Sequence, residues 1–358
     1  MSAARVDAVV EEVAERELDA LLVSGEVNVR WATGFTGTNA LAVVGKDVRV
    51  FLTDFRYVEQ AEEEVDGGFD RRRGERDLRG DVRGALPDRR PLRLGFDDAQ
   101  MSVRTHARLE EQLGEGIELV AAGGIVEDLR AVKDADELGL VRTAARIADE
   151  ALREVLDGGL AGRTEREVAR ALENAIRDRD AEPSFPSIVA AGPHGALPHA
   201  EPRDVAIPEG TLVVVDWGAR YHGYCSDCTR TFATGELDGA AGDVYDLVLR
   251  AQRAGLEAVR PGPAGKEVDA LAREVIAEAG HGDAFGHGLG HGVGLEVHEA
   301  PTLSKRGEQH LAAHNVVTVE PGVYLPGRFG VRIEDLAIVT EDGTEVLSSL
   351  PKELTVVG

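Results

Sequence analysis

Four acidic residues stand at the ends of, or within, runs that are typical of β-strands, and this placement constrains the fold more than any other feature of the sequence. They are Asp216, Asp227, Glu320 and Glu334. The first directly follows the apolar run 211–215, and the third directly follows 315–319. A buried carboxylate without a partner is strongly unfavourable, so a cluster of four requires positive charge beside it. We therefore expect distant strand ends to converge around bound cations.

A glycine-rich segment with three histidines lies between the two pairs of acids. It spans residues 285–301 and contains His287, His291 and His298. The alternating glycines at 286–294 make a helix improbable, so the segment is expected to be extended or looping. They suit either a tight crossing between sheets or a close approach of backbone to a substrate. One histidine with four carboxylates is an oxygen-rich ligand set, which favours manganese, cobalt or iron over structural zinc.

The length of 358 residues favours two domains of unequal size. We expect an α/β domain over residues 1–125. Its predicted strands are 20–23, 40–44, 48–52 and 92–96, and its predicted helices lie near 3–17, 55–65 and 102–113. The apolar pattern lapses between 66 and 90, where arginines 71–73 lie among acids. This lapse favours a solvated loop over an anion-binding patch.

The second domain, expected over residues 126–358, repeats one order of elements. Two helices begin at the capping boxes Asp134/Glu137 and Thr164/Glu167, and strands follow from 187 to 232. Helices near 239–259 and 266–279, followed by strands from about 285 to the end, repeat that order. The pattern indicates a coarse internal duplication, and a cleft between two related halves is a natural ligand site.

The charge of the chain excludes one class of partner. With 65 acidic and 40 basic residues, the net charge of −25 repels phosphate backbones, so we expect no nucleic-acid partner. Only five of the basic residues are lysines, and aromatic residues make up only 4% of the chain. We interpret this composition as an acidic, halophile-like surface on which salt screens self-repulsion.

Neither the cysteines nor the hydropathy pattern points to another class of protein. Cys225 and Cys228 form a single C-x-x-C, which is a weak zinc signal, and we expect both to be reduced and not to act together as ligands. The amino-terminal segment carries no apolar run of the signal-peptide type, and no run approaches 18 apolar residues. We therefore expect a cytoplasmic protein with no membrane partner.

The candidate ligands also carry a family resemblance. The ordered set Asp216, Asp227, His291, Glu320 and Glu334 resembles that of the dinuclear metallopeptidases of the pita-bread fold, such as aminopeptidase P and prolidase. Segments 28–37 and 52–57 resemble the amino-terminal domain of the prolidase and aminopeptidase P branch, and 129–133 resembles its junction motif. The resemblance implies a creatinase/prolidase-type α/β domain over 1–125, an α+β pita-bread domain over 126–358, and a homodimer.

The resemblance also implies an activity: hydrolysis of the bond between an N-terminal residue and proline, through a hydroxide that bridges two divalent metal ions. Manganese is preferred over cobalt, iron or zinc. The five residues of the set are the implied metal ligands, and Glu320 is also the implied acid/base. His199 and His298 would hydrogen-bond the substrate carbonyl and the developing oxyanion, and Arg332 would orient the ligands. His287 lies outside the ligand set, as a packing or substrate-lining residue.

Thr302 departs from the family pattern. Many prolidases carry an arginine directly after the sequence His-Glu-Ala-Pro, where it could bind the free carboxylate of a dipeptide. Arg306 or Arg328 could substitute, so the sequence leaves Xaa-Pro dipeptidase and Xaa-Pro aminopeptidase specificity open. A metal-independent creatinase-like amidinohydrolase and a non-catalytic pita-bread binding module are the alternative functions. Both would be expected to lack the ligand set, which is intact here.

Overall fold

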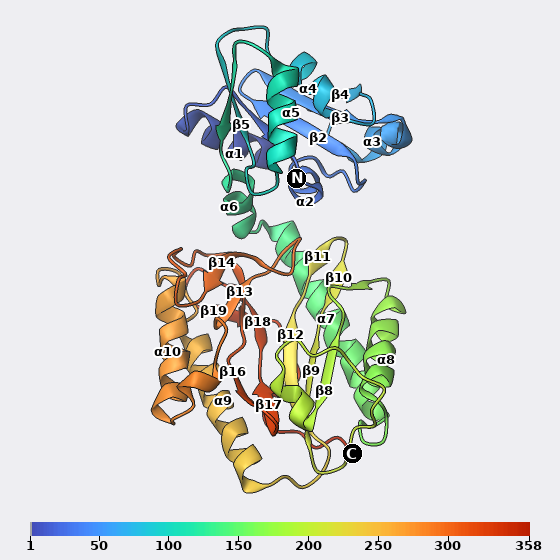
Figure 1. Cartoon of the computed structure of the whole chain (residues 1–358), viewed down its shortest axis with the longest axis vertical. Helices are drawn as coiled ribbons and strands as arrows, with labels where there is room; N and C mark the ends of the chain where they lie inside the picture. Colours follow the sequence, from blue (N-terminus) through green and yellow to red (C-terminus); the bar gives the residue numbers. More distant parts are fainter. Residues whose placement is uncertain (1) are drawn as a thin grey trace. The chain divides into compact units, whose positions relative to one another are not determined.

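The computed structural model describes residues 2–358, which divide into two compact units, one ending at Arg130 and the other spanning Ala131–Gly358 (Figure 1). The division lies five residues beyond the expected boundary at 125. The helix α6 (Ile125–Ala131) explains the difference. Its residues Ile125 and Val126 are buried, and Arg130 donates from Nη1 to Asn28 Oδ1 at 2.7 Å, so the helix mostly continues the first unit. No helix within residues 2–358 combines the length and the apolar character that crossing a membrane requires.

The first unit is built on a six-stranded sheet with the order β4-β3-β2-β1-β5-β6. The strands are β1 (Ala20–Val23), β2 (Ala40–Gly45), β3 (Val48–Thr53), β4 (Asp70–Arg73), β5 (Leu92–Phe96) and β6 (Ile117–Ala121). The helices are α1 (Ser2–Glu15), α2 (Glu26–Thr33), α3 (Val58–Glu64), α4 (Arg79–Ala85) and α5 (Val103–Leu113), with a 3-10 turn at Phe55–Tyr57. The expected α/β class is confirmed. The four strands predicted from apolar runs form its centre, because these runs are buried on both faces.

The prediction of a solvated loop over 66–90 is wrong, because the segment contains β4 and α4. β4 is an edge strand that pairs only with β3, so a charged sequence is tolerated and no apolar alternation marks it. Two of its three arginines form ion pairs: Arg71 contacts Glu62 at 3.1 Å and Arg72 contacts Asp70 at 2.7 Å. These pairs also argue against an anion-binding patch.

The second unit consists of two halves, each with two helices beside a sheet. The first half contains α7 (Ala135–Asp157) and α8 (Glu165–Arg177), with the sheet β12-β9-β8 formed by β8 (Ile188–Ala191), β9 (Leu212–Trp217) and β12 (Cys228–Ala233). The second half contains α9 (Gly239–Ala258) and α10 (Gly265–Glu278), with the sheet β14-β13-β15-β18-β19. Its strands are β13 (Gly290–Gly292), β14 (Glu299–Leu303), β15 (Val316–Val319), β18 (Asp335–Val339) and β19 (Thr344–Val346).

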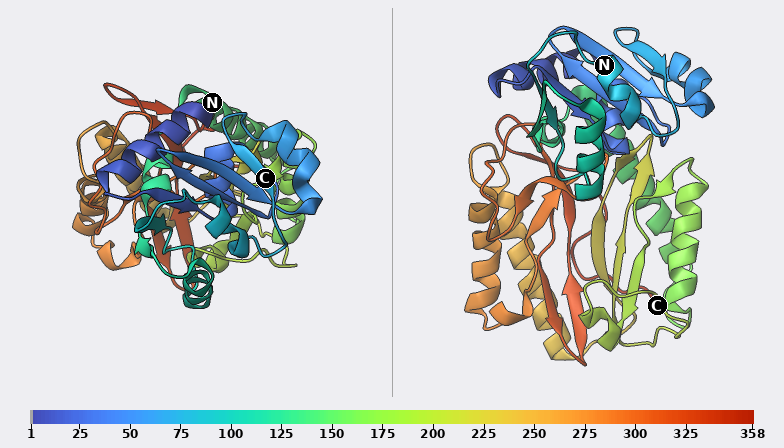
Figure 2. Two further views of the ribbon diagram at one scale, coloured as in Figure 1. Left: turned by 90° about the horizontal axis from the view of Figure 1, so that it is seen from above. Right: turned by 45° about the horizontal axis from the view of Figure 1, so that its top comes forward.

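Shorter elements complete the second unit. They are β7 (Glu182–Pro183), η2 (Gly192–Ala196), β10 (Ala219–Tyr221), β11 (Tyr224–Cys225), η3 (Gly282–Ala284), β16 (Gly322–Leu325) and β17 (Phe329–Arg332). Helices α7 and α8 flank the strands on one side and α9 and α10 on the other, as both Figure 1 and the right-hand view of Figure 2 show. Each pair of helices packs its apolar face on its own sheet. The predicted repeat of helix, helix and strands is therefore the architecture of this unit.

The helix starts follow the predicted capping boxes. Asp134 accepts from the Glu137 amide at 2.9 Å, and the Glu137 carboxylate accepts from the Asp134 amide at 2.8 Å. Thr164 and Glu167 form the same reciprocal pair before α8. Each box satisfies two amides that the first turn leaves without helical partners, which is why these helices could be located from sequence.

Candidate metal centre

The five predicted ligands line one cavity of about 530 Å³ between the two halves of the second unit. They come from five different places in the chain: Asp216 in β9, Asp227 just before β12, His291 in β13, Glu320 just after β15, and Glu334 between β17 and β18. The antiparallel register of β9 and β12 places Asp216 opposite Thr229, so Asp227 lies two residues further along the same pair of strands. The structure thus brings together residues that are up to 118 positions apart.

Three of the five side chains converge most closely. One ligand atom each from Asp227, His291 and Glu334 lies within 4.8 Å of the other two. His291 Nε2 lies 3.7 Å from Asp227 Oδ2 and 3.3 Å from Glu320 Oε1. His291 Nδ1 donates to the Gly292 carbonyl at 3.0 Å, because a carbonyl can only accept. In the neutral imidazole this leaves the Nε2 lone pair facing the acids, as a metal ligand requires.

The electrostatics of this cluster fit bound cations. Burial raises the pKa of Asp227 well above its ordinary value, and the charges of Glu334 and Asp216 raise it further. Burial and repulsion by Glu320 and Asp216 act in the same direction on the pKa of Glu334. Asp216 Oδ1 and Glu334 Oε1 are buried and lack a hydrogen-bond partner. Oxygen atoms with unsatisfied charge beside one imidazole form a donor set suited to divalent metal ions.

Glu320 differs from the other acids in its surroundings. Burial alone would raise its pKa, but the hydrogen bond of His291 and, when that imidazole is protonated, its positive charge lower it below the ordinary value. Thr318 also donates to Glu320 Oε1 at 3.3 Å. Glu320 is therefore the carboxylate of the cluster that stays ionised most readily.

Arg332 occupies the centre of a network that the sequence predicted only in part. It donates from Nη2 to Asp216 Oδ2 at 2.6 Å and from Nε to Thr229 Oγ1 at 3.0 Å. Thr229 in turn donates to Glu334 Oε2 at 2.7 Å, so one threonine links the arginine to a candidate ligand. Arg332 also donates to Tyr324 Oη at 2.8 Å. Thr229 lies two residues after Asp227, where strand alternation could have indicated a shared face, but nothing in the sequence signals Tyr324.

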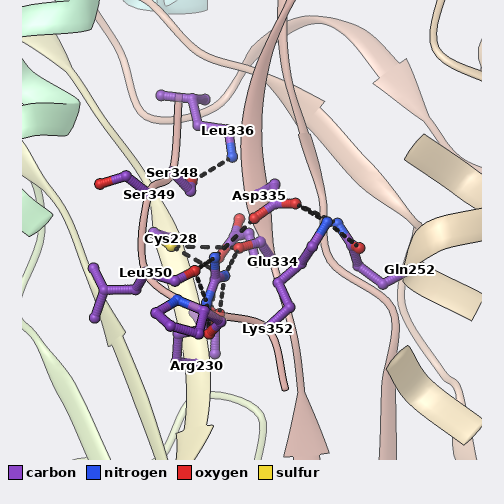
Figure 3. A network of polar contacts seen from close by, with 12 residues as sticks. Cys228, Arg230, Gln252, Glu334, Asp335, Leu336, Ser348, Ser349, Leu350 and Lys352 are labelled. Carbon is purple, nitrogen blue, oxygen red and sulfur yellow. Dashed lines mark hydrogen bonds and ion pairs between the residues drawn. The ribbon is translucent and has the colours of Figure 1, made fainter. Parts of the chain in front are cut away.

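A second polar network, centred on Arg230, contacts the backbone carbonyl of Glu334 (Figure 3). Arg230 is almost fully buried and donates to the Glu334 carbonyl, to Asp335 Oδ1 at 2.9 Å and to the Leu350 carbonyl at 2.8 Å. Asp335 Oδ2 accepts from Gln252 at 2.9 Å and from Lys352 at 2.6 Å. These contacts attach the segment that contains Leu350 and Lys352 to β18, the strand that directly follows the candidate ligand Glu334.

The remaining histidines that the sequence singled out also lie in the cavity. His199 and His298 line it, and the ring of His298 lies 4.3 Å from that of His291, centroid to centroid. His287 lines it as well and makes no acid contact: its Nδ1 donates to the Gly288 carbonyl at 2.8 Å, and its Nε2 accepts from Tyr324 at 2.9 Å. The geometry of His287 therefore agrees with a lining position outside the ligand set.

The two cysteines are buried free thiols. Burial raises the pKa of Cys225 to about 12 and that of Cys228 well above its ordinary value, so both remain protonated. Cys228 Sγ lies 3.3 Å from the Glu334 carbonyl and Cys225 Sγ lies 3.9 Å from the Leu295 carbonyl. They pack beside the centre and do not form a joint ligand pair.

The glycines of the histidine-rich segment allow close contact between strands. A Cβ at Gly290 would lie 2.0 Å from the Thr318 carbonyl oxygen, and one at Gly292 would lie 2.1 Å from that of Ala300. Of the two uses considered for the alternating glycines, the structure shows tight strand packing at these two positions. Gly286 has open space instead.

The fold and the converging side chains define a two-domain metallopeptidase. Residues 139–341 match metallopeptidase family M24, and residues 5–132 match the creatinase/prolidase N-terminal domain. The chain belongs to metallopeptidase family M24.

Relatives cover nearly the whole chain. The uncharacterized peptidase YqhT of Bacillus subtilis is 42% identical over 340 residues, 95% of this chain and 96% of the relative. A Xaa-Pro dipeptidase of Pyrococcus horikoshii is 33% identical over 355 residues, 98% of each chain. Among solved structures, Xaa-Pro dipeptidase from Bacillus anthracis has a TM-score of 0.92 and 38% identity, covering 99% of this chain and 100% of that one. X-Pro aminopeptidase from Thermotoga maritima has a TM-score of 0.87 and 35% identity, covering 96% and 99%.

These comparisons confirm the resemblance to the pita-bread metallopeptidases, the fold class and the expectation of an enzyme. Membership of a metallopeptidase family, together with five candidate ligands that line one cavity, gives no support to a metal-independent amidinohydrolase or to a non-catalytic binding module.

Proposed function

We propose that this metallopeptidase hydrolyses the bond between an N-terminal residue and a following proline. The observation that carries the proposal is the convergence in one cavity of the four predicted acidic ligands with His199, His291 and His298. The names of relatives that span nearly the whole chain support the choice of proline substrates.

Asp216, Asp227, His291, Glu320 and Glu334 would hold two divalent ions, and manganese is our first choice because oxygen donors predominate. When bound, two such ions would lower the pKa of a water that they share, so that it could act as hydroxide at neutral pH, and would polarise the scissile carbonyl. By the family resemblance, Asp227 and Glu334 would be shared by both ions, and burial together with neighbouring carboxylates raises the pKa of each well above its ordinary value, which fits nearby positive charge. Asp216 keeps its orientation through the hydrogen bond from Arg332.

Glu320, His199 and His298 would handle protons and charge during the reaction. The ionised Glu320 carboxylate can accept a proton from the attacking water and return it to the proline nitrogen, which must leave as an amine. His199 and His298 face the same cavity and can donate hydrogen bonds to the carbonyl oxygen as negative charge develops on it.

An apolar wall offers a place for the proline ring. Phe185, Pro186, Ile188 and Val297 are apolar residues that line the cavity. A ring without an amide N–H makes no demand for a hydrogen-bond acceptor, so an apolar surface suits it.

The positively charged side chains that line the cavity bear on the length of the substrate. Among the described residues that line it, Arg332 is the single arginine or lysine, and its donors already serve Asp216, Thr229 and Tyr324. Neither Arg306 nor Arg328 lines the cavity, and Thr302 is exposed on β14. We therefore propose that tripeptides with proline in second position are cleaved at least as well as Xaa-Pro dipeptides.

The test is release of free amino acid from Ala-Pro and Ala-Pro-Ala after removal of metal and reconstitution with manganese, cobalt, iron or zinc. We expect turnover of both peptides only with added metal, and none with Ala-Ala-Ala as the matched control. Full activity of the Glu334→Gln variant, or full activity after exhaustive chelation, would overturn the proposal.

A further inference from the structure

The segment 191–203 carries Pro198 and His199 into the cavity, and its two ends are held by one buried side chain. Glu165, the first residue of α8, is fully buried. Its Oε1 accepts from the Ala191 amide at 3.0 Å, at the start of the segment. Its Oε2 accepts from the Arg203 amide at 3.0 Å, at the end of the segment.

Side chains within the segment add to this attachment. Arg203 donates from Nη2 to Oε1 at 2.9 Å and from Nε to Oε2 at 3.0 Å, the bidentate geometry that arginine prefers with a carboxylate. His194 Nδ1 lies 3.0 Å from Oε2. Burial alone would raise the pKa of Glu165, but the hydrogen bonds from Arg203 and from the amides lower it, so the group is ionised at neutral pH.

The middle of the segment has a separate attachment on the side of the metal centre. Arg332 Nη1 donates to the Pro198 carbonyl at 3.2 Å, one residue before His199. The backbone that carries His199 is therefore attached at both ends to Glu165 and at its middle to the arginine that orients Asp216. His199 itself is exposed and lines the cavity, so the position of this backbone sets where its side chain enters the cavity.

The other half of the unit uses a related device. Asp269 in α10 is buried, accepts from the Leu289 amide at 3.0 Å, and pairs with Arg273 at 2.7 Å. Arg273 also donates to the carbonyls of Phe285 and His287 at 2.9 and 2.7 Å. In both halves, a buried carboxylate on the second helix holds the backbone that brings histidines to the cavity.

We propose that Glu165, with Arg203, is a positioning residue that sets the place of His199 against the substrate. The inference rests on the proposed peptidase function and on the role of His199 in it. Loss of this attachment would displace His199 while leaving the metal ligands, which lie on other elements, in place. Because small displacements of a hydrogen-bonding group weaken catalysis strongly, we expect Glu165→Gln to lower kcat/KM about 10- to 100-fold.

The test is a double-mutant cycle on Ala-Pro-Ala with Glu165→Gln, His199→Ala and the double variant, all saturated with metal. If Glu165 acts through His199, Glu165→Gln has almost no further effect in the His199→Ala background. Arg203→Met provides a second cycle, since its partly exposed side chain can be replaced without burying a new polar group. This cycle decides the question if Glu165→Gln does not fold.

Glu167→Gln is the matched control, because it changes the same residue type in the same helical turn but faces only the helix start. We expect this control to retain wild-type activity and every variant to bind Mn²⁺, measured by calorimetry, within about twofold of wild type. Multiplicative losses in both cycles, or a fall in Mn²⁺ affinity that matches the fall in activity, would overturn the inference. An inactive wild-type protein would instead refute the proposed function.

Discussion

At the scale of single residues, the buried carboxylate of Asp227 lowers the stability of the folded protein when it is ionised. Its folded-state pKa is raised by burial and by Glu334, so ionisation is easier in the unfolded chain. The stability that belongs to the protonated form is present below the unfolded pKa and is lost as pH rises through the folded pKa. Without metal, the protein must therefore weaken as the cluster ionises.

The Asp227→Asn variant tests this opposition. At pH 8 in chelator, we expect it to be more stable than wild type by about 1–2 kcal/mol, because one repelling charge is gone. With manganese the order should reverse, and activity should fall at least about 100-fold. Thermal unfolding with and without metal measures the stabilities, and release of free amino acid from Ala-Pro measures the activity. Asp204→Asn, at an exposed ion pair, is the control, and equal melting temperatures of Asp227→Asn and wild type in chelator would contradict the prediction.

Asp97 provides a pH-dependent effect in the first unit. Burial and the neighbouring Glu127 raise its pKa to about 6, and Asn28 donates to both carboxylates. Since the folded pKa exceeds the unfolded one, this contribution to stability is present at low pH and disappears as pH rises through about 6.

We therefore expect Asp97→Asn to flatten the change in unfolding free energy between pH 5 and pH 7.5 by on the order of 1 kcal/mol. Urea unfolding at both pH values measures the difference between variant and wild type. The same pH dependence in both proteins would contradict a raised pKa at Asp97.

At the scale of elements, the packing of β13 against β15 requires a glycine at position 290. A methyl group at Gly290 would collide with the backbone of β15, whereas one at Gly286 would meet nothing within 4 Å. Gly290→Ala should lower the unfolding free energy by about 1–3 kcal/mol, and Gly286→Ala should leave it nearly unchanged. Urea midpoints of the pair measure the contrast, and equal midpoints would refute the role of close strand packing.

Elements differ in how far the sequence could locate them. Capping boxes mark α7 and α8, because their hydrogen bonds join residues three positions apart. The sequence did not predict edge strand β4, because this strand forms through pairing with β3 and through ion pairs such as that of Arg71 with Glu62. Local signals thus located helices that begin with local contacts and missed a strand defined by its neighbours.

At the scale of the whole molecule, the net charge of −25 acts on every residue at once. Self-repulsion lowers stability in dilute buffer, and salt screens it over about 10 Å at 0.1 M. We expect the melting temperature to rise between low and molar potassium chloride by several degrees. Differential scanning calorimetry measures it, with a sulfate-free buffer to avoid general salting-out. A melting temperature that stays constant or falls would contradict a surface adapted to salt.

The sequence by itself determined the kinds and order of the residues that carry the chemistry. The acids after strand-like runs, the histidine-rich segment and the repeated order of helices and strands all depend on neighbours in the chain. Such local patterns give both the ligand residue types and the two halves that must enclose them.

Only the tertiary structure decided how those residues are held. Thr229 lies between Arg332 and Glu334, and Glu165 holds both ends of the segment that carries His199, through contacts across 26 to 105 positions. Such contacts have no local periodicity, because they arise only when separate elements pack together. The spacing of residues in a sequence indicates which chemical groups are available. Their distances and burial in the folded protein determine which of them interact and where each side chain is held.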